Sequence, residues 1–138
     1  MYLIDPNVVS EARKGASANR GVIAFLENGA ALEDVVFLSA ISIGELRRSV
    51  ELIRRRGDAD QADRLEAWLA TVVNSFGDRI LGLDADVAQI WGRLRVPDPS
   101  HALDKQIAAT ALVNGLTLVT RNVADFAGLG VEMANPFD

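Results

Sequence analysis

The chain of 138 residues is predicted to fold as one α/β domain, residues 1–138, around a central, mostly parallel sheet. Short apolar runs, typical of strands buried on both faces, alternate along it with segments of helical periodicity. No internal repeat, low-complexity segment or linker interrupts this alternation. Helices are therefore expected on both faces of the sheet, with right-handed connections between parallel strands.

Five apolar runs predict the strands. The first, 2–5, ends in the carboxylate of Asp5, and the second, 35–38, is β-branched and aromatic. Runs at 80–83 and 116–119 predict a third and a fourth strand, and 131–133 a weak fifth. Their lengths suit strands better than helices.

Helix signals lie between these runs. Ser42 and Asp84 stand at N-cap positions, and Asn114-Gly115 suits a left-handed helix end. Pro97-Asp98-Pro99 breaks the chain between two helices. The predicted helices are 7–14 (closed by Gly15), 19–26 (ending before Gly29), 43–56 (stopped by Gly57), 61–76, 87–94 and 103–113, with 43–56 and 61–76 forming a helical hairpin.

Composition limits the function. The chain is 49% hydrophobic and has no cysteine, so it predicts a compact globule without disulfides or thiolate metal sites. We see neither a leader peptide nor an apolar run that could span a membrane, and we expect a cytoplasmic protein. A net charge of −5 argues against a simple nucleic-acid binder. The five arginines between 47 and 56 are either a solvated helix face or contacts for phosphates or an acidic partner.

Four acids stand at predicted element boundaries: Asp5, Glu45, Asp104 and Asp125. Asp5 follows a buried strand, and ligands of open α/β sheets bind outside the carboxyl ends of strands. Carboxylates gathered in a cleft repel one another unless they are protonated or neutralised, and divalent metals that prefer oxygen ligands neutralise them. The acids therefore suggest a metal site.

Each acid except Asp5 also has a purely structural interpretation. Ser42-x-x-Glu45 is a capping-box pattern, and Asn122-x-x-Asp125 is a weaker cap of the same type. Asp104 lies in the first turn of its predicted helix, where the macrodipole favours negative charge. Both interpretations stay open at this point.

Other chemistries fit less well. The single histidine, His101, excludes a two-histidine ribonuclease mechanism and is expected on the surface at a helix start. A phosphatase using Asp5 as nucleophile is an alternative, but such enzymes need a second aspartate where this chain has Asn7. Trp68 and Trp91 are expected in the core instead of stacking on bases.

Four segments together resemble a known family: LIDPNVVSE from Leu3, LSAISIGELRRSVEL from Leu38, LDKQIAATALVNGLTLVTRNVADF from Leu103, and the tail ending Asn135-Pro136-Phe137. In this order they resemble the PIN-domain ribonuclease toxins of the VapC and FitB type, the toxic halves of toxin-antitoxin pairs. The resemblance covers essentially the whole chain.

The resemblance implies a three-layer α/β/α domain that cleaves RNA with Mg²⁺ or Mn²⁺ held by acids. Its motifs assign the first three acids to Asp5, Glu45 and Asp104. The fourth falls at Asn122 or Asp125, and we expect Asp125, with Asn122 orienting it or a metal-bound water. Asn7 and Thr120 are expected to support the site.

Two positions depart from the family pattern. Pro6 stands where a threonine is common, which removes a hydroxyl from the metal's surroundings and favours an extended backbone at Asp5. Lys105 stands beside the third acid, where it is expected at the pocket rim, within reach of the RNA backbone.

The expected function is a metal-dependent endoribonuclease toxin of a type II pair, inhibited by a cognate antitoxin and homodimeric within a toxin-antitoxin hetero-oligomer. A catalytically weak or degenerate PIN scaffold that binds RNA or partners without cutting is the alternative outside enzymes.

Overall fold

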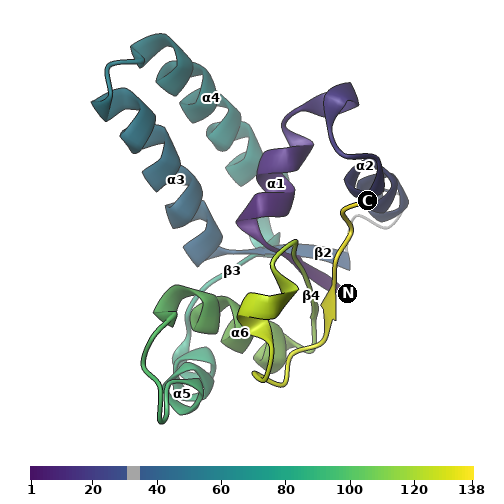
Figure 1. The fold of residues 1–138 in the computed structure, drawn as a ribbon, viewed down its shortest axis with the longest axis vertical. Helices are drawn as coiled ribbons and strands as arrows, with labels where there is room; N and C mark the ends of the chain where they lie inside the picture. Colours follow the sequence, from purple (N-terminus) through teal and green to yellow (C-terminus); the bar gives the residue numbers. More distant parts are fainter. Residues whose placement is uncertain (31–34) are drawn as a thin grey trace.

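A wholly parallel five-stranded sheet forms the centre of the computed structural model, which describes residues 1–30 and 35–138. The strand order is β3-β2-β1-β4-β5 (Figure 1). The strands are β1 (Tyr2–Ile4), β2 (Val36–Ser39), β3 (Ile80–Leu81), β4 (Thr117–Val119) and β5 (Met133–Ala134). The predicted α/β class is thus confirmed, and the fifth strand lies slightly later than predicted because Met133 and Ala134 pair with Leu118 and Val119.

Helices cover both faces of the sheet (Figure 1). They are α1 (Pro6–Ala12), α2 (Arg20–Ala30), α3 (Ala40–Arg55), α4 (Ala59–Phe76), α5 (Ala85–Leu94) and α6 (Ala102–Asn114), with short 3-10 helices η1 (Gly15–Ser17), η3 (Gly77–Arg79) and η4 (Val123–Phe126). All six predicted helices are present. No helix among the described residues is long and apolar enough to cross a membrane.

Two hydrophobic cores lie on opposite faces of the sheet. Successive strand residues point to opposite faces, so Ile4 joins the core beneath α1–α4 and Leu3 joins the core beneath α5, α6 and η4. Leu118 and Val119 of β4 divide in the same way. Burial on both faces explains why these strands are continuous apolar runs.

Helix ends agree with the sequence signals except at three places. The first is α1, which ends at Ala12 and is not closed by Gly15, because Gly15 begins η1. The side chain of Asp84 caps α5 by accepting a hydrogen bond from Val87 N, and Gly115 ends α6 with a left-handed φ of 65°. Gly29, predicted to lie beyond α2, is inside it. Ser42 does not begin α3, because Ser39 is the N-cap and its Oγ accepts a hydrogen bond from Ile41 N.

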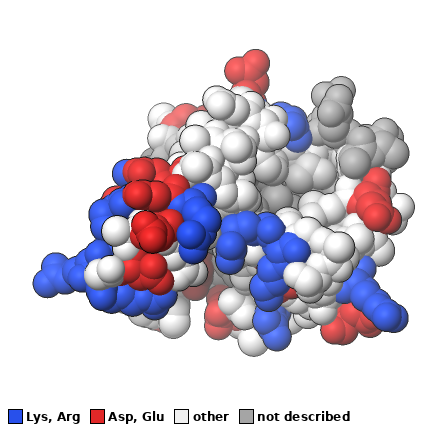
Figure 2. Space-filling model, turned by 90° about the horizontal axis from the view of Figure 1, so that it is seen from above, with Lys and Arg blue, Asp and Glu red and all other residues white. Residues whose placement is uncertain are grey.

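The helices α3 and α4 form the predicted hairpin, which projects from the sheet at the upper left of Figure 1. Ion pairs hold its outer surface: Arg47 and Arg54 bind Glu66, and Arg54 also binds Asp63. Figure 2 shows the resulting mixture of positive and negative side chains on this part of the surface. Two arginines of the predicted cluster are therefore engaged within the hairpin, in exposed pairs that contribute little stability.

Candidate active site

Asp5 lies at the carboxyl end of β1, where the strand order reverses. Strands β2 and β3 lie on one side of β1, and β4 and β5 on the other. The backbone N–H of Asp5 donates to the carbonyl oxygen of Val119 at 2.9 Å, so the residue continues the strand pairing before the chain turns into α1. Such a reversal point is where open α/β sheets bind ligands. The residue is only 7% exposed.

The carboxylate of Asp5 is oriented by two side chains. Thr120 Oγ1 donates to Asp5 Oδ2 at 2.7 Å, and Asn7 Nδ2 donates to the same oxygen at 3.2 Å. Asp5 has the extended backbone expected before Pro6, with φ −76° and ψ 154°. Its side chain does not cap α1. Among the described residues Oδ1 receives no hydrogen bond, so this oxygen is available to a ligand.

Thr120 is the centre of a network that joins β4 to the start of α1. It is fully buried, and its Oγ1 accepts a hydrogen bond from the backbone N–H of Asn122 at 3.0 Å. The Arg121 backbone N–H donates to Asn7 Oδ1 at 3.4 Å. The loop after β4 is thus tied to both residues that hold Asp5. In the sequence, the only local sign of this role is that Thr120 directly follows a buried strand. Its hydrogen bond to Asp5, 115 positions away, cannot be inferred from local patterns.

The acids influence one another electrostatically: Asp104 and Asp125 act on Asp5, and Asp125 and Glu45 act on Asp104. Burial raises the pKa of Asp5 to about 6, the Thr120 hydrogen bond opposes this, and the negative charges of Asp104 and Asp125 raise the pKa further. Burial also raises the pKa of Asp104, and Asp125 and Glu45 add to it. The four acids predicted from sequence are therefore electrostatically coupled in the folded chain.

Four separate elements supply these carboxylates. Asp5 follows β1, Glu45 lies in α3, Asp104 lies in the first turn of α6, and Asp125 lies in η4. The Asp104 side chain is 36% exposed, so this acid is open to solvent on one side. The group is therefore an acidic site at the switch point of the sheet, with a buried Asp5 and a partly exposed Asp104.

The donor set suits a hard divalent cation. All four groups offer carboxylate oxygens, and a cation would relieve the repulsion that raises the pKa values of Asp5 and Asp104. No group of three or more His, Cys, Asp or Glu within residues 1–30 and 35–138 is close enough to hold one ion jointly. Mg²⁺ commonly keeps several waters and binds directly to one or two carboxylates, so this open arrangement fits it.

The capping-box interpretation of Glu45 is wrong. Because α3 begins at Ala40, Ser42 lies inside the helix and Glu45 lies a turn further along than a capping-box acid would. Ser42 is fully buried, and its Oγ has no hydrogen-bond partner in the described part of the chain. Glu45 is therefore not accounted for by helix capping.

The predicted roles of Asn122 and Asp125 hold only in part. Asn122 precedes η4, but its side chain makes no capping hydrogen bond and none to Asp125. Its backbone carbonyl instead accepts from Asp125 N at 3.0 Å. Asn122 therefore supports the site through its backbone N–H to Thr120; its side chain makes no hydrogen bond to Asp125, and its contact with a metal-bound water stays a prediction.

Lys105 does not lie at the pocket rim. It is 7% exposed, and its Nζ donates to the carbonyl oxygen of Asp98 at 2.6 Å. It thus anchors the loop before α6 and cannot reach a nucleic-acid backbone. His101 is exposed at the start of α6, as expected, with Nδ1 4.0 Å from Asp104 Oδ2.

The tryptophans are only partly buried, not fully in the core as expected. Trp68 packs against the core beneath α1–α4. Trp91 instead binds the carbonyl oxygen of Ala102 through Nε1 at 3.0 Å. The guanidinium groups of Arg13 and Arg95 cover their respective rings, Trp68 and Trp91.

The parallel sheet, with electrostatically coupled acids at its switch point, defines an α/β protein with a candidate site at the carboxyl ends of its strands. The PIN domain family model matches residues 2–129 of the chain. The chain belongs to the PIN domain family.

Two relatives match the chain over nearly their whole length. The chain is 36% identical to Toxin FitB of Neisseria gonorrhoeae, over 99% of both chains. It is 30% identical to VapC ribonuclease Y4jK of Sinorhizobium fredii, over 100% of this chain and 99% of that one. The crystal structure of FitAcB from Neisseria gonorrhoeae superposes with a TM-score of 0.84 at 34% identity, covering 99% of this chain and 98% of the other.

Proposed function

We propose that the chain is the toxin of a type II toxin-antitoxin pair and cleaves RNA as a metal-dependent endoribonuclease. The observation that carries the proposal is the buried Asp5 carboxylate, held through Oδ2 and coupled to Asp104 and Asp125 at the switch point of the sheet. Relatives named as a toxin and as a VapC ribonuclease support the same activity. In this proposal the protein acts on RNA in the cytoplasm.

Asp5 and Asp104 would hold Mg²⁺ or Mn²⁺ in this proposal, with Glu45 and Asp125 adding charge around it. When bound, the ion would lower the pKa of a water molecule and neutralise charge on the scissile phosphate. Thr120 and Asn7 keep Asp5 Oδ2 occupied, so Oδ1 faces the ligand in one orientation. With a pKa of about 6, Asp5 is mostly ionised at neutral pH.

Cleavage of RNA by purified, antitoxin-free protein tests this function. We expect products with Mg²⁺ or Mn²⁺ and none after chelation by EDTA. If neither ion supports any cleavage, while RNA is still bound, the chain is a scaffold that binds without cutting. A burst of the alcohol product from a small phosphomonoester, followed by slower release of phosphate, would instead indicate that Asp5 acts as the nucleophile of a phosphatase.

Asp125→Ala is expected to lower both RNA cleavage and metal affinity by about ten- to a hundredfold, the scale of losses around a metal's direct ligands. The reason is that Asp125 acts on Asp5 and Asp104 through its charge. Titration calorimetry and single-turnover cleavage measure the two effects.

Asp78→Ala is the matched control, since Asp78 is also an exposed acid in a short 3-10 helix but is not coupled to Asp5 or Asp104. Asn122→Asp should tighten metal binding. Should Asp125→Ala leave both quantities unchanged while Asn122→Ala destroys them, the fourth acid position belongs to Asn122.

An apolar groove between α1 and the α3–α4 hairpin is the proposed docking site of an antitoxin segment. It is lined by Leu46, Val50, Ile53, Leu65 and Trp68, and continues along α1 toward Phe76. The similar FitAcB structure and the structure of FitAB bound to IR36 DNA make a toxin-antitoxin assembly the expected partner arrangement. We propose that an amphipathic segment fills the groove and places a basic side chain near the acids. The toxin is a homodimer in the proposed complex.

Leu65→Glu is expected to weaken inhibition by the antitoxin, because it puts a charge into the groove that the apolar segment would bury. Leu52→Glu is the control, since Leu52 is 48% exposed on α3 and does not line the groove. Cleavage assays with added antitoxin compare the variants. Reversing the antitoxin's basic residue should also weaken inhibition, and equal inhibition in every case would indicate another docking face.

A further inference from the structure

Arg121 is a cation beside the acid site whose charge no carboxylate of the described residues neutralises by an ion pair. Its backbone N–H is bound by Asn7 Oδ1, the same side chain that holds Asp5. Its own side chain is exposed and makes no ion pair within residues 1–30 and 35–138. The acid whose pKa it affects is Glu11, not Asp5 or Asp104. The side chain therefore extends from the loop beside Asn7 toward Glu11, on the α1 side of the acid site.

Phe137 holds this guanidinium in place. The Cζ atom of Arg121 lies 4.9 Å from the centre of the Phe137 ring, a cation–π distance that leaves the outer N–H groups free. The ring itself packs against the core beneath α1–α4. A long exposed arginine normally samples many rotamers, so this platform reduces the entropy lost when the guanidinium binds a ligand.

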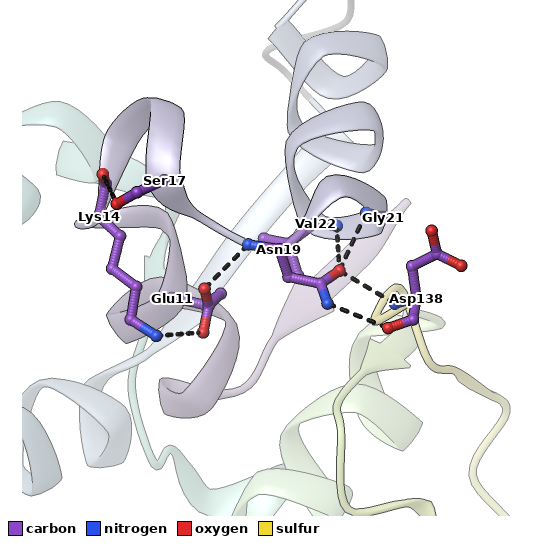
Figure 3. Close-up of polar contacts among 7 residues, drawn as sticks. All are labelled: Glu11, Lys14, Ser17, Asn19, Gly21, Val22 and Asp138. Carbon is purple, nitrogen blue, oxygen red and sulfur yellow. Dashed lines mark hydrogen bonds and ion pairs between the residues drawn. The ribbon is translucent and has the colours of Figure 1, made fainter.

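The chain segment that carries Phe137 is fixed in turn by the start of α2. Asn19 Oδ1 accepts from Asp138 N at 3.0 Å, and Asn19 Nδ2 donates to the Asp138 carbonyl oxygen at 3.1 Å (Figure 3). A Cβ atom at Gly21 would overlap the carbonyl oxygen of Pro136, so the tail and α2 are in close contact. The tail thus acts as a rigid mount for the ring under Arg121.

Glu11, the nearest candidate to neutralise Arg121, is already satisfied. Lys14 Nζ and the Asn19 backbone N–H each donate to its carboxylate at 2.9 Å (Figure 3). These two bonds, and then smaller contributions that include the charge of Arg121, keep the pKa of Glu11 below its usual value. Arg121 is therefore left with its donors available for an external anion.

We propose that Arg121, mounted on Phe137, binds a phosphate of the RNA next to the scissile one. The inference rests on the proposed ribonuclease function and names a substrate-positioning residue for it. A chain of net charge −5 with an acidic site repels a polyanion, so a fixed cation beside the site is needed to bring the backbone to the acids. Guanidinium groups bind phosphate oxygens through paired N–H donors, which fixes direction as well as distance.

Binding of a fluorescein-labelled, short single-stranded RNA of mixed sequence tests the proposal. Measurements use the full chain with Asp104→Asn as background, so that the RNA stays intact, which a gel verifies. Arg121→Gln should weaken binding about tenfold, the loss of one hydrogen-bonded charge contact. The slope of log affinity against log salt should fall by about 0.7, as expected for one phosphate contact on a single strand.

Three further variants make the result specific. Arg55→Gln removes the same charge from an exposed arginine of α3 and should leave affinity and salt slope unchanged. Arg121→Lys should restore the slope but only part of the affinity. Phe137→Leu should lower affinity with an unchanged slope, since the cation remains and only its mount is lost. Melting curves establish that each variant is folded.

The proposal is overturned if Arg121→Gln leaves the RNA affinity and the salt slope unchanged. It is also overturned if Arg55→Gln lowers both quantities as much as Arg121→Gln does, because the effect would then come from net charge alone. These outcomes are independent of the ribonuclease proposal. If the wild-type chain cuts no RNA but Arg121→Gln still lowers the salt slope, the phosphate contact stands in an RNA-binding protein and the enzymatic proposal fails alone.

Discussion

Asp5→Asn is expected to abolish RNA cleavage and growth inhibition while leaving the fold intact, and Asp104→Asn to do the same. Both substitutions keep the side-chain shape and remove the charge that would hold the metal ion. An amide at position 5 still accepts the Thr120 hydrogen bond through its oxygen. Circular dichroism and cleavage of a mixed RNA pool measure the two consequences separately.

Asp86→Asn is the matched control, an exposed acid in the first turn of α5 that is not coupled to Asp5 or Asp104. It should retain full cleavage. If Asp5→Asn or Asp104→Asn keeps activity within about threefold of wild type, the residue makes no contact specific to the transition state and the site assignment fails.

The metal-free protein is expected to lose stability as the pH rises from about 4 to about 7. Asp5 has a pKa of about 6 in the folded chain against its ordinary value of 3.8, so the folded state binds its proton more tightly than the unfolded state. The stability this proton contributes is complete below the unfolded pKa and is lost as the pH passes the folded one. The difference corresponds to about 3 kcal/mol.

Urea unfolding across this pH range, in EDTA, measures the effect. Asp5→Asn should remove most of the pH dependence, because asparagine does not titrate. At pH 7, Mg²⁺ or Mn²⁺ should raise the melting temperature of the wild type, since the ion binds the folded state preferentially. Ca²⁺ should bind but support less cleavage. An equal metal-dependent shift in Asp5→Asn would show that the ion binds elsewhere.

The apolar groove beside Trp68 and the exposed cation Arg121 are associated with opposite ends of the same helix, α1. Arg13, near its end, covers Trp68, while Asn7, at its start, binds the backbone of Arg121. A partner in the groove and an RNA at the acids would therefore both contact surfaces organised by α1.

Local signals in the sequence determined the elements of this protein. Strand β1 was predictable because Leu3 and Ile4 enter opposite cores, which requires a continuous apolar run. Asp84 and Gly115 marked helix ends because capping needs particular side chains and backbone angles. The same type of signal misplaced the start of α3, since Ser39 and Ser42 are both acceptable caps and only the position of β2 selects between them.

The tertiary structure alone decided how the site is built. The four acids were predicted from the sequence, but their proximity depends on the order of the strands. That order places β4 beside β1, so that Thr120 can donate a hydrogen bond to Asp5. Lys105 was predicted to lie at the rim of the site, but in the fold its ammonium group is bound by the carbonyl oxygen of Asp98. Arg121 meets Phe137 only because the tail returns to α2. Such contacts join residues far apart in the chain, and no local periodicity or cap encodes them.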